Sequence, residues 1–154
     1  MLEGALHLDC RDVHAAFRVV DGGFCADEGR LTVSLEARPV DPKVWPPRAL
    51  FCLEGAPLAA GGLCQGARFH CNYSARLHQW SSLQLPKVHG YFTFHAMDVE
   101  LAFVVAALQP DAVMFHFDGT SEDPNYYDDR ARPAHWRGEF WLPRRACDEL
   151  WIPS

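Results

Sequence analysis

The sequence predicts an α+β fold that is mainly antiparallel β, arranged as a sandwich or a curved sheet, with one short helix. Three observations lead to this prediction. Apolar and polar residues alternate in about seven or eight short stretches, turn-forming residues separate these stretches, and residues 98–108 are rich in leucine and alanine. A chain of 154 residues falls within the size of one domain, so we expect residues 1–154 to share a single core.

The first strands are expected at residues 5–10, 13–20 and 30–38, where side chains alternate between apolar and polar. Residues 30–38 show this alternation most clearly. The sequence Asp-Gly-Gly at residues 21–23 supplies the backbone conformations of a tight turn, so the second strand should begin a hairpin.

Prolines between residues 39 and 47 predict a rigid connection, because proline cannot donate a hydrogen bond to a neighbouring strand. Further strands are expected at residues 48–53 and 67–73, on either side of a loop rich in glycine and alanine. Residues 74–85 combine helical spacing with a Ser-Ser pair that weakens a helix, so no element is assigned to them.

The longest apolar run of the chain lies near its centre. We predict a strand at residues 91–95, a helix that begins with Asp98 as its N-cap and runs to residue 108, and a strand at residues 111–117. The alternative is a buried strand at residues 99–108, which would make the fold an all-β sandwich. Periodicity alone does not separate the two for an apolar run of this length.

The end of the chain should contain one more strand. Residues 118–135 are predicted to form a long polar loop, and residues 136–142 alternate as a strand that Pro143 ends. Residues 148–154 form a tail that its apolar side chains can anchor.

Composition excludes several classes of protein. A formal charge of −6 argues against a nucleic-acid binder, since phosphate binding needs clustered Lys and Arg. The apolar run at residues 101–108 is too short to span a bilayer, so no membrane association is expected.

The first residues lack the basic and apolar regions of an export signal, which predicts a cytoplasmic protein. In that compartment the six cysteines should be free, mostly buried thiols.

Metal ligands are the first candidates for chemistry, because the chain contains 8 His and 6 Cys. The tight ligand pairs of zinc sites are missing from the sequence, and no metal site or cofactor is predicted. Looser His-x-Asp pairs occur at His7 with Asp9 and at His116 with Asp118. If their strands were neighbours, these four side chains would converge, which keeps a metal-dependent enzyme or metalloprotein as the alternative function.

No catalytic residue is predicted, because the chain lacks a nucleophile elbow, a P-loop and a calcium-binding loop. Cys64, in a glycine-rich loop, is the one thiol expected to be exposed. A thiol without an orienting histidine is not a catalytic site.

The strongest functional candidate is the predicted loop after residue 117, which combines acids with a Tyr-Tyr pair. Such loops are uncommon inside compact domains and are often functional. Carboxylates steer a basic partner and tyrosines supply contact area. The predicted partner-binding residues are Asp118, Glu122, Asp123, Tyr126, Tyr127, Asp128 and Asp129.

The leading hypothesis is therefore a cytoplasmic protein-binding module that docks on a basic protein. Its most specific form is an immunity protein, or antitoxin, that neutralises a basic toxin. A third hypothesis is a homo-oligomer that associates through Trp141 or Trp151, since exposed aromatic side chains often mark interfaces.

Overall fold

The structure, a computed structural model, describes residues 2–73, 87–92, 95–96, 99–124 and 133–153. In this part of the chain ten strands form one antiparallel sheet in the order β5-β8-β9-β10-β1-β2-β3-β4-β6-β7. The strands are β1 (Glu3–Asp9), β2 (His14–Asp27), β3 (Arg30–Pro39), β4 (Ala49–Pro57), β5 (Arg68–Tyr73), β6 (Lys87–Phe92), β7 (His95–Ala96), β8 (Val99–Gln109), β9 (Ala112–Ser121) and β10 (Ala134–Pro143). A single 3₁₀ turn, η1 (Cys147–Glu149), follows the last strand.

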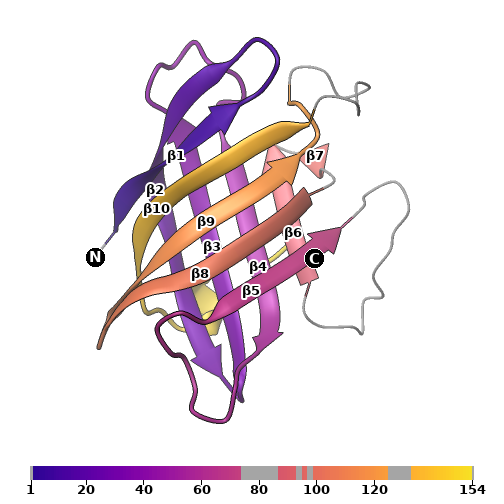
Figure 1. Cartoon of the computed structure of the whole chain (residues 1–154). Coiled ribbons are helices and arrows are strands. Elements are labelled where there is room, and N and C mark those ends of the chain that lie inside the picture. The colour runs from indigo at the N-terminus through magenta and orange to yellow at the C-terminus, as the bar shows by residue number, and fades with distance from the viewer. Residues whose placement is uncertain (1, 74–86, 93–94, 97–98, 125–132, 154) are drawn as a thin grey trace.

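The sheet curves strongly and nearly closes on itself (Figure 1). A front layer contains β1, β10, β9, β8 and β5, and a rear layer contains β2, β3, β4 and β6. The strand β2 joins the layers, and its pairing with β3 shifts register between Val19 and Asp21. Such a bulge bends a strand and increases its twist. At the far end of the sheet β5 contacts β6, so the core lies between the two layers.

The apolar run near the centre of the chain is the strand β8, so the helix predicted at residues 98–108 is wrong and the alternative strand is confirmed. Leu101, Phe103 and Val105 are buried in the core, as the inner face of a strand requires. Both edges of β8 are paired, with β5 on one side and β9 on the other. Asp98, the predicted N-cap, lies outside the described residues.

Aromatic rings fill the centre of the core. Trp136 is fully buried, and its ring lies 5.0 Å from that of Phe17, 5.2 Å from Phe51 and 5.4 Å from Phe92. Its indole nitrogen donates a hydrogen bond to Ser121 Oγ at 3.0 Å. The one polar atom of this large side chain is therefore satisfied inside the core.

The residues that follow β10, here called the tail (residues 144–153), lie on the outer side of the rear layer. A disulfide joins Cys25 of β2 to Cys147, with 5.4 Å between the two Cα atoms. The expectation of free thiols is therefore wrong for this pair, whereas the other four cysteines form no disulfide; of these, Cys10 and Cys52 are buried and Cys64 is exposed. No helix in the described part of the chain is long and apolar enough to cross a membrane.

Candidate functional site

The predicted acidic segment begins later than the sequence indicates. The strand β9 continues to Ser121, so Asp118 belongs to the sheet and not to a loop. Its side chain is 68% exposed on the outer face of the front layer, with Oδ1 at 2.7 Å from His135 Nε2. Glu122 is half-buried, and Asp123 is only 1% exposed. Asp123 therefore does not present its carboxylate to a partner in the way that Asp118 does.

The remaining members of the predicted contact surface, Tyr126, Tyr127, Asp128 and Asp129, lie outside the described residues. The structure describes the two points at which this segment meets the sheet, the ends of β9 and β10. At the same end of the front layer the exposed side chains of Asp9 and Asp118 flank β10.

The four metal-ligand candidates do not converge. His7 and Asp9 lie on β1 while His116 and Asp118 lie on β9, and β10 separates the two strands. Arg137 of β10 is the register partner of both His7 and Asp118. Two strand spacings of roughly 9–10 Å exceed the reach of a shared ion, whose ligand bonds are about 2 Å long. Within the described ranges, no group of three His, Cys, Asp or Glu could hold a metal ion.

Four histidines, of which only His116 was a metal-ligand candidate, instead form pairs with carboxylates of neighbouring strands. The pairs are His14 with Asp9 at 2.8 Å, His135 with Asp118 at 2.7 Å, His116 with Glu139 at 3.0 Å and His70 with Glu100 at 3.0 Å. The contact with His14 is the main cause of a lowered pKa at Asp9; burial opposes the shift and Arg137, 3.2 Å away, adds to it. All four pairs lie on the outer face of the front layer, which we call the histidine-carboxylate face.

This face contains a shallow depression of about 210 Å³. Its lining includes Glu100, Asp118 and Thr120, with Arg68 and His70 beside them, and the small side chain of Ala102 leaves the space between the two carboxylates. The two carboxylates are 58% and 68% exposed. An incoming cationic side chain can therefore meet both.

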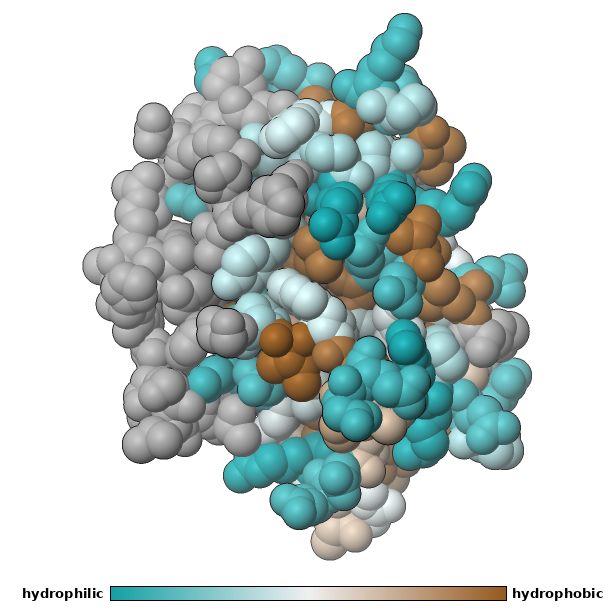
Figure 2. Space-filling view, turned by 180° about the vertical axis from the view of Figure 1, so that it is seen from behind, coloured by the Kyte–Doolittle hydropathy of each residue, from teal (hydrophilic) through white to brown (hydrophobic). Residues whose placement is uncertain are grey.

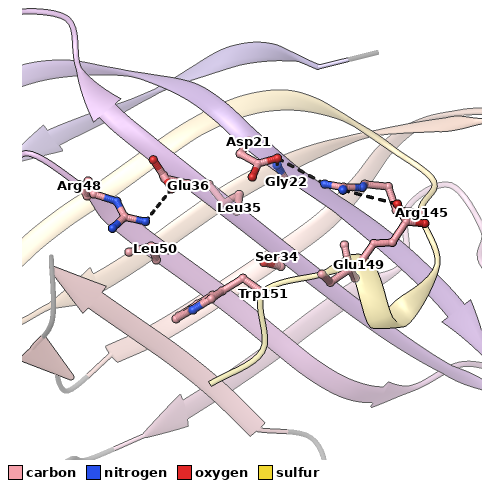
Figure 3. A pocket seen from close by; sticks show the side chains of 11 residues that line it. Asp21, Gly22, Ser34, Leu35, Glu36, Arg48, Leu50, Arg145, Glu149 and Trp151 are labelled. Carbon is pink, nitrogen blue, oxygen red and sulfur yellow. Dashed lines mark hydrogen bonds and ion pairs between the residues drawn. The ribbon is translucent and has the colours of Figure 1, made fainter. Parts of the chain in front are cut away.

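A second hollow, which we call the tail cavity, lies between the tail and the outer face of β2, β3 and β4, with a volume of about 180 Å³. Arg48 and Glu36 stand at one end, and Asp21, Arg145 and Glu149 stand at the other (Figure 3). Between these ends the lining includes Ser34, Leu50 and Trp151 (Figure 3), and Leu150 also lines the cavity.

Several contacts hold the tail over this cavity. Besides the disulfide, Arg145 donates its backbone N–H to the Phe24 carbonyl at 2.9 Å, and the ring of Trp151 lies 5.4 Å from that of Tyr91. Gly23 leaves room for the crossing, because a Cβ there would lie 2.7 Å from Arg145 Cδ. The rear face mixes hydrophobic and hydrophilic residues (Figure 2).

Charges at the two ends of the tail cavity are paired differently. Burial alone would raise the pKa of Glu36, but hydrogen bonds from Arg48 at 2.9 Å and Arg38 at 2.7 Å outweigh it and lower this pKa. Arg145 reaches Asp21 at 3.3 Å and Glu149 at 3.6 Å. Charge-assisted hydrogen bonds are typically about 2.7–2.9 Å, so the carboxylates at this second end keep spare acceptor capacity.

A buried thiol faces an imidazole on the rear layer, a pairing that the sequence did not reveal. Cys52 of β4 is the register partner of His89 of β6, and His89 Nε2 lies 3.1 Å from Glu54 Oε2. Burial raises the pKa of the Cys52 thiol above its ordinary value, with a contribution from the charge of Glu54. Burial also lowers the pKa of His89, although Glu54 opposes this. A thiol that stays protonated is a poor nucleophile, so this arrangement is not a catalytic site as it stands.

No protein-family model, curated protein or solved structure matches the chain.

Proposed function

We propose that this protein is a protein-binding module that docks on a basic protein partner. The most specific form of the proposal is an immunity protein that neutralises a basic toxin. The observation that carries it is the exposed pair of carboxylates, Asp118 and Glu100, on the histidine-carboxylate face beside the point where the acidic segment leaves β9.

Geometry favours these two carboxylates as a docking point. Thr120 is the register partner of Glu100, and Asp118 is two residues before Thr120 on the same strand. Carboxylates in such diagonal positions lie roughly 7–8 Å apart, so one guanidinium group can lie between them. Each carboxylate is already oriented by an imidazole, which reduces the entropy lost when a partner binds.

Net charge supports the same partner class. The chain carries −6, and such a charge speeds association with a basic surface. Asp128 and Asp129, with Tyr126 and Tyr127, add charge and contact area to the adjoining segment by sequence. The cytoplasmic location stays a prediction, and the disulfide weighs against it, because disulfides are typical of oxidising compartments.

The test begins with affinity capture of the native partner from the source cell, followed by surface plasmon resonance at two salt concentrations. The test variant combines Glu100→Gln, Asp118→Asn and Asp128→Asn; Asp123 is left intact because its side chain is buried. We expect slower association and a weaker dependence of the association rate on salt, since the removed charges steer the encounter.

The control removes three exposed acids elsewhere, with Asp27→Asn, Glu28→Gln and Asp41→Asn. Both variants lose the same net charge, so their association rates should differ only if the partner binds at the acids removed in the test variant. Equal association rates for test and control variants would refute the proposed surface.

A further inference from the structure

We propose that the tail cavity binds a small zwitterion, a molecule in which a carboxylate and an ammonium group are separated by a short apolar chain. The inference is independent of the docking proposal, because the cavity lies on the rear layer and the histidine-carboxylate face lies on the front layer.

The end of the cavity at Arg48 suits the carboxylate. Two guanidinium groups, those of Arg38 and Arg48, share the single carboxylate of Glu36, which leaves an excess of one positive charge. The buried Nε of Arg48 has no hydrogen-bond partner. An unsatisfied buried donor costs about 1–3 kcal/mol, and a ligand oxygen at this end would supply the missing acceptor.

The opposite end suits the ammonium group. Among the described residues, Arg145 is the cationic partner of both Asp21 and Glu149, which leaves an excess of one negative charge. The backbone N–H groups of Gly22 and Ala146 also donate to these carboxylates. Both ion pairs are long, at 3.3 Å and 3.6 Å, and both carboxylates are more than half exposed, at 71% and 55%. They can accept hydrogen bonds from an ammonium group without giving up a short contact.

Apolar side chains line the space between the ends. Leu50 and Trp151 face it from opposite sides, the sheet and the tail (Figure 3). Its volume of about 180 Å³ is close to that of an apolar cavity known to hold a benzene molecule, about 150 Å³. A chain of about four methylene groups between the charged ends fits this size.

The tail forms one wall of the cavity and is fixed before any ligand arrives. The Cys25–Cys147 disulfide anchors it, and Trp151 rests on Tyr91. A preformed site loses less conformational entropy on binding.

The experiment is a titration of the full-length oxidised protein, followed by ¹H–¹⁵N correlation spectra. Three probes are compared: 5-aminopentanoate, pentanoate, which lacks the ammonium group, and pentylammonium, which lacks the carboxylate. We expect 5-aminopentanoate to shift the amide signals of Ser34 and Leu50 and the indole signal of Trp151, with a dissociation constant on the order of 1 mM, as eight heavy atoms allow. Each half-molecule should bind about tenfold more weakly, since it loses one charge-assisted interaction.

Two variants locate the site. Arg48→Gln should weaken the binding of 5-aminopentanoate about tenfold, while Arg137→Gln, which removes an exposed arginine from β10 in the front layer, should leave it unchanged. Asp21→Asn should weaken the binding of 5-aminopentanoate at the end of the cavity that takes the ammonium group. This variant serves as the test if Arg48→Gln lowers the melting temperature.

Three results would overturn the inference. The first is the absence of saturable shifts at Ser34, Leu50 and Trp151 at ligand concentrations up to 20-fold the expected dissociation constant, on the order of 20 mM. The second is equal affinity for the three probes, and the third is equal affinity of the Arg48→Gln and Arg137→Gln variants for 5-aminopentanoate. None of these results bears on the front-face docking surface, so the two proposals fail separately.

Discussion

Removal of the disulfide between Cys25 and Cys147 should cost this protein a large share of its stability. The two cysteines are 122 residues apart in the sequence, so the bond closes a loop that includes most of the chain. In the chain-entropy model a crosslink that closes a loop of this length lowers the entropy of the unfolded chain and so raises the free energy of unfolding by about 5 kcal/mol. Measured increases are typically about 2–4 kcal/mol. Domains of ordinary stability unfold with about 5–15 kcal/mol in total.

The perturbation is the double variant Cys25→Ser with Cys147→Ser, which leaves no new free thiol. Urea unfolding, followed by tryptophan fluorescence and circular dichroism, should show the free energy of unfolding lowered by about 2–5 kcal/mol. The reduced wild-type protein should unfold at nearly the same urea concentration as the variant.

Reductant added to the double variant is the internal control, because the four remaining cysteines form no disulfide. The variant's midpoint should not move. A difference below about 1 kcal/mol between oxidised wild type and variant would refute the reasoning, since it would mean that the crosslink does not restrict the unfolded chain.

Three further predictions concern the core, the pairing of β1 with β10 and the rear layer. Trp136→Ala should lower the free energy of unfolding by about 3–5 kcal/mol in chemical denaturation, because it removes the central ring of the core. Gly138→Ala should cost about 3 kcal/mol, because its Cβ would lie 2.1 Å from the Ala5 carbonyl oxygen; Gly61→Ala, whose nearest neighbour lies at 3.8 Å, should cost far less. Burial lowers the pKa of His89, so the unfolded chain takes up this proton first as the pH falls. Stability should therefore be complete above about pH 6.5 and decline below it, and His89→Gln should reduce the slope measured between pH 7 and pH 5.5.

Strand positions were predictable where apolar side chains on the core face alternate with polar side chains on the outer face, even though Thr32 and Ser34 on the outer face of β3 are buried as well. Residues 30–38 alternate cleanly because β3 has the core on one side only, with Leu31, Val33 and Leu35 inward. The final strand was predictable for the same reason. Binary patterning identifies such strands without any knowledge of their partners.

The strand β8 was not predictable in this way. Its leucines and alanines are good helix formers, and local propensity alone favours a helix. Pairing with β5 and β9 satisfies the backbone of β8 on both edges, and burial of Leu101 and Phe103 between the layers outweighs the propensity. Both partners are distant or lie beyond a turn, so the decisive contacts are absent from the local sequence.

The sequence did not predict the candidate sites, for a related reason. His14 pairs with Asp9 across a hairpin, and His70 pairs with Glu100 from a strand 30 residues away. The sequence instead suggested His7 with Asp9, two residues apart on one strand. Spacing along a strand reports which face a side chain occupies, but strand order decides which side chains meet. The tail cavity depends on the same information, because β2, β3, β4 and the tail form its walls.

Strand order also explains how the two layers differ in their chemistry. On the front layer each of four carboxylates has its own imidazole, so the acids are oriented and still exposed to a large partner. On the rear layer three acids and three arginines share contacts unequally, and the tail encloses the space between them. An open, evenly paired face suits a protein surface, whereas an enclosed, unevenly paired space suits a small charged molecule. Asp118→Asn should therefore change partner docking and leave the binding of 5-aminopentanoate intact, and Arg48→Gln should do the reverse.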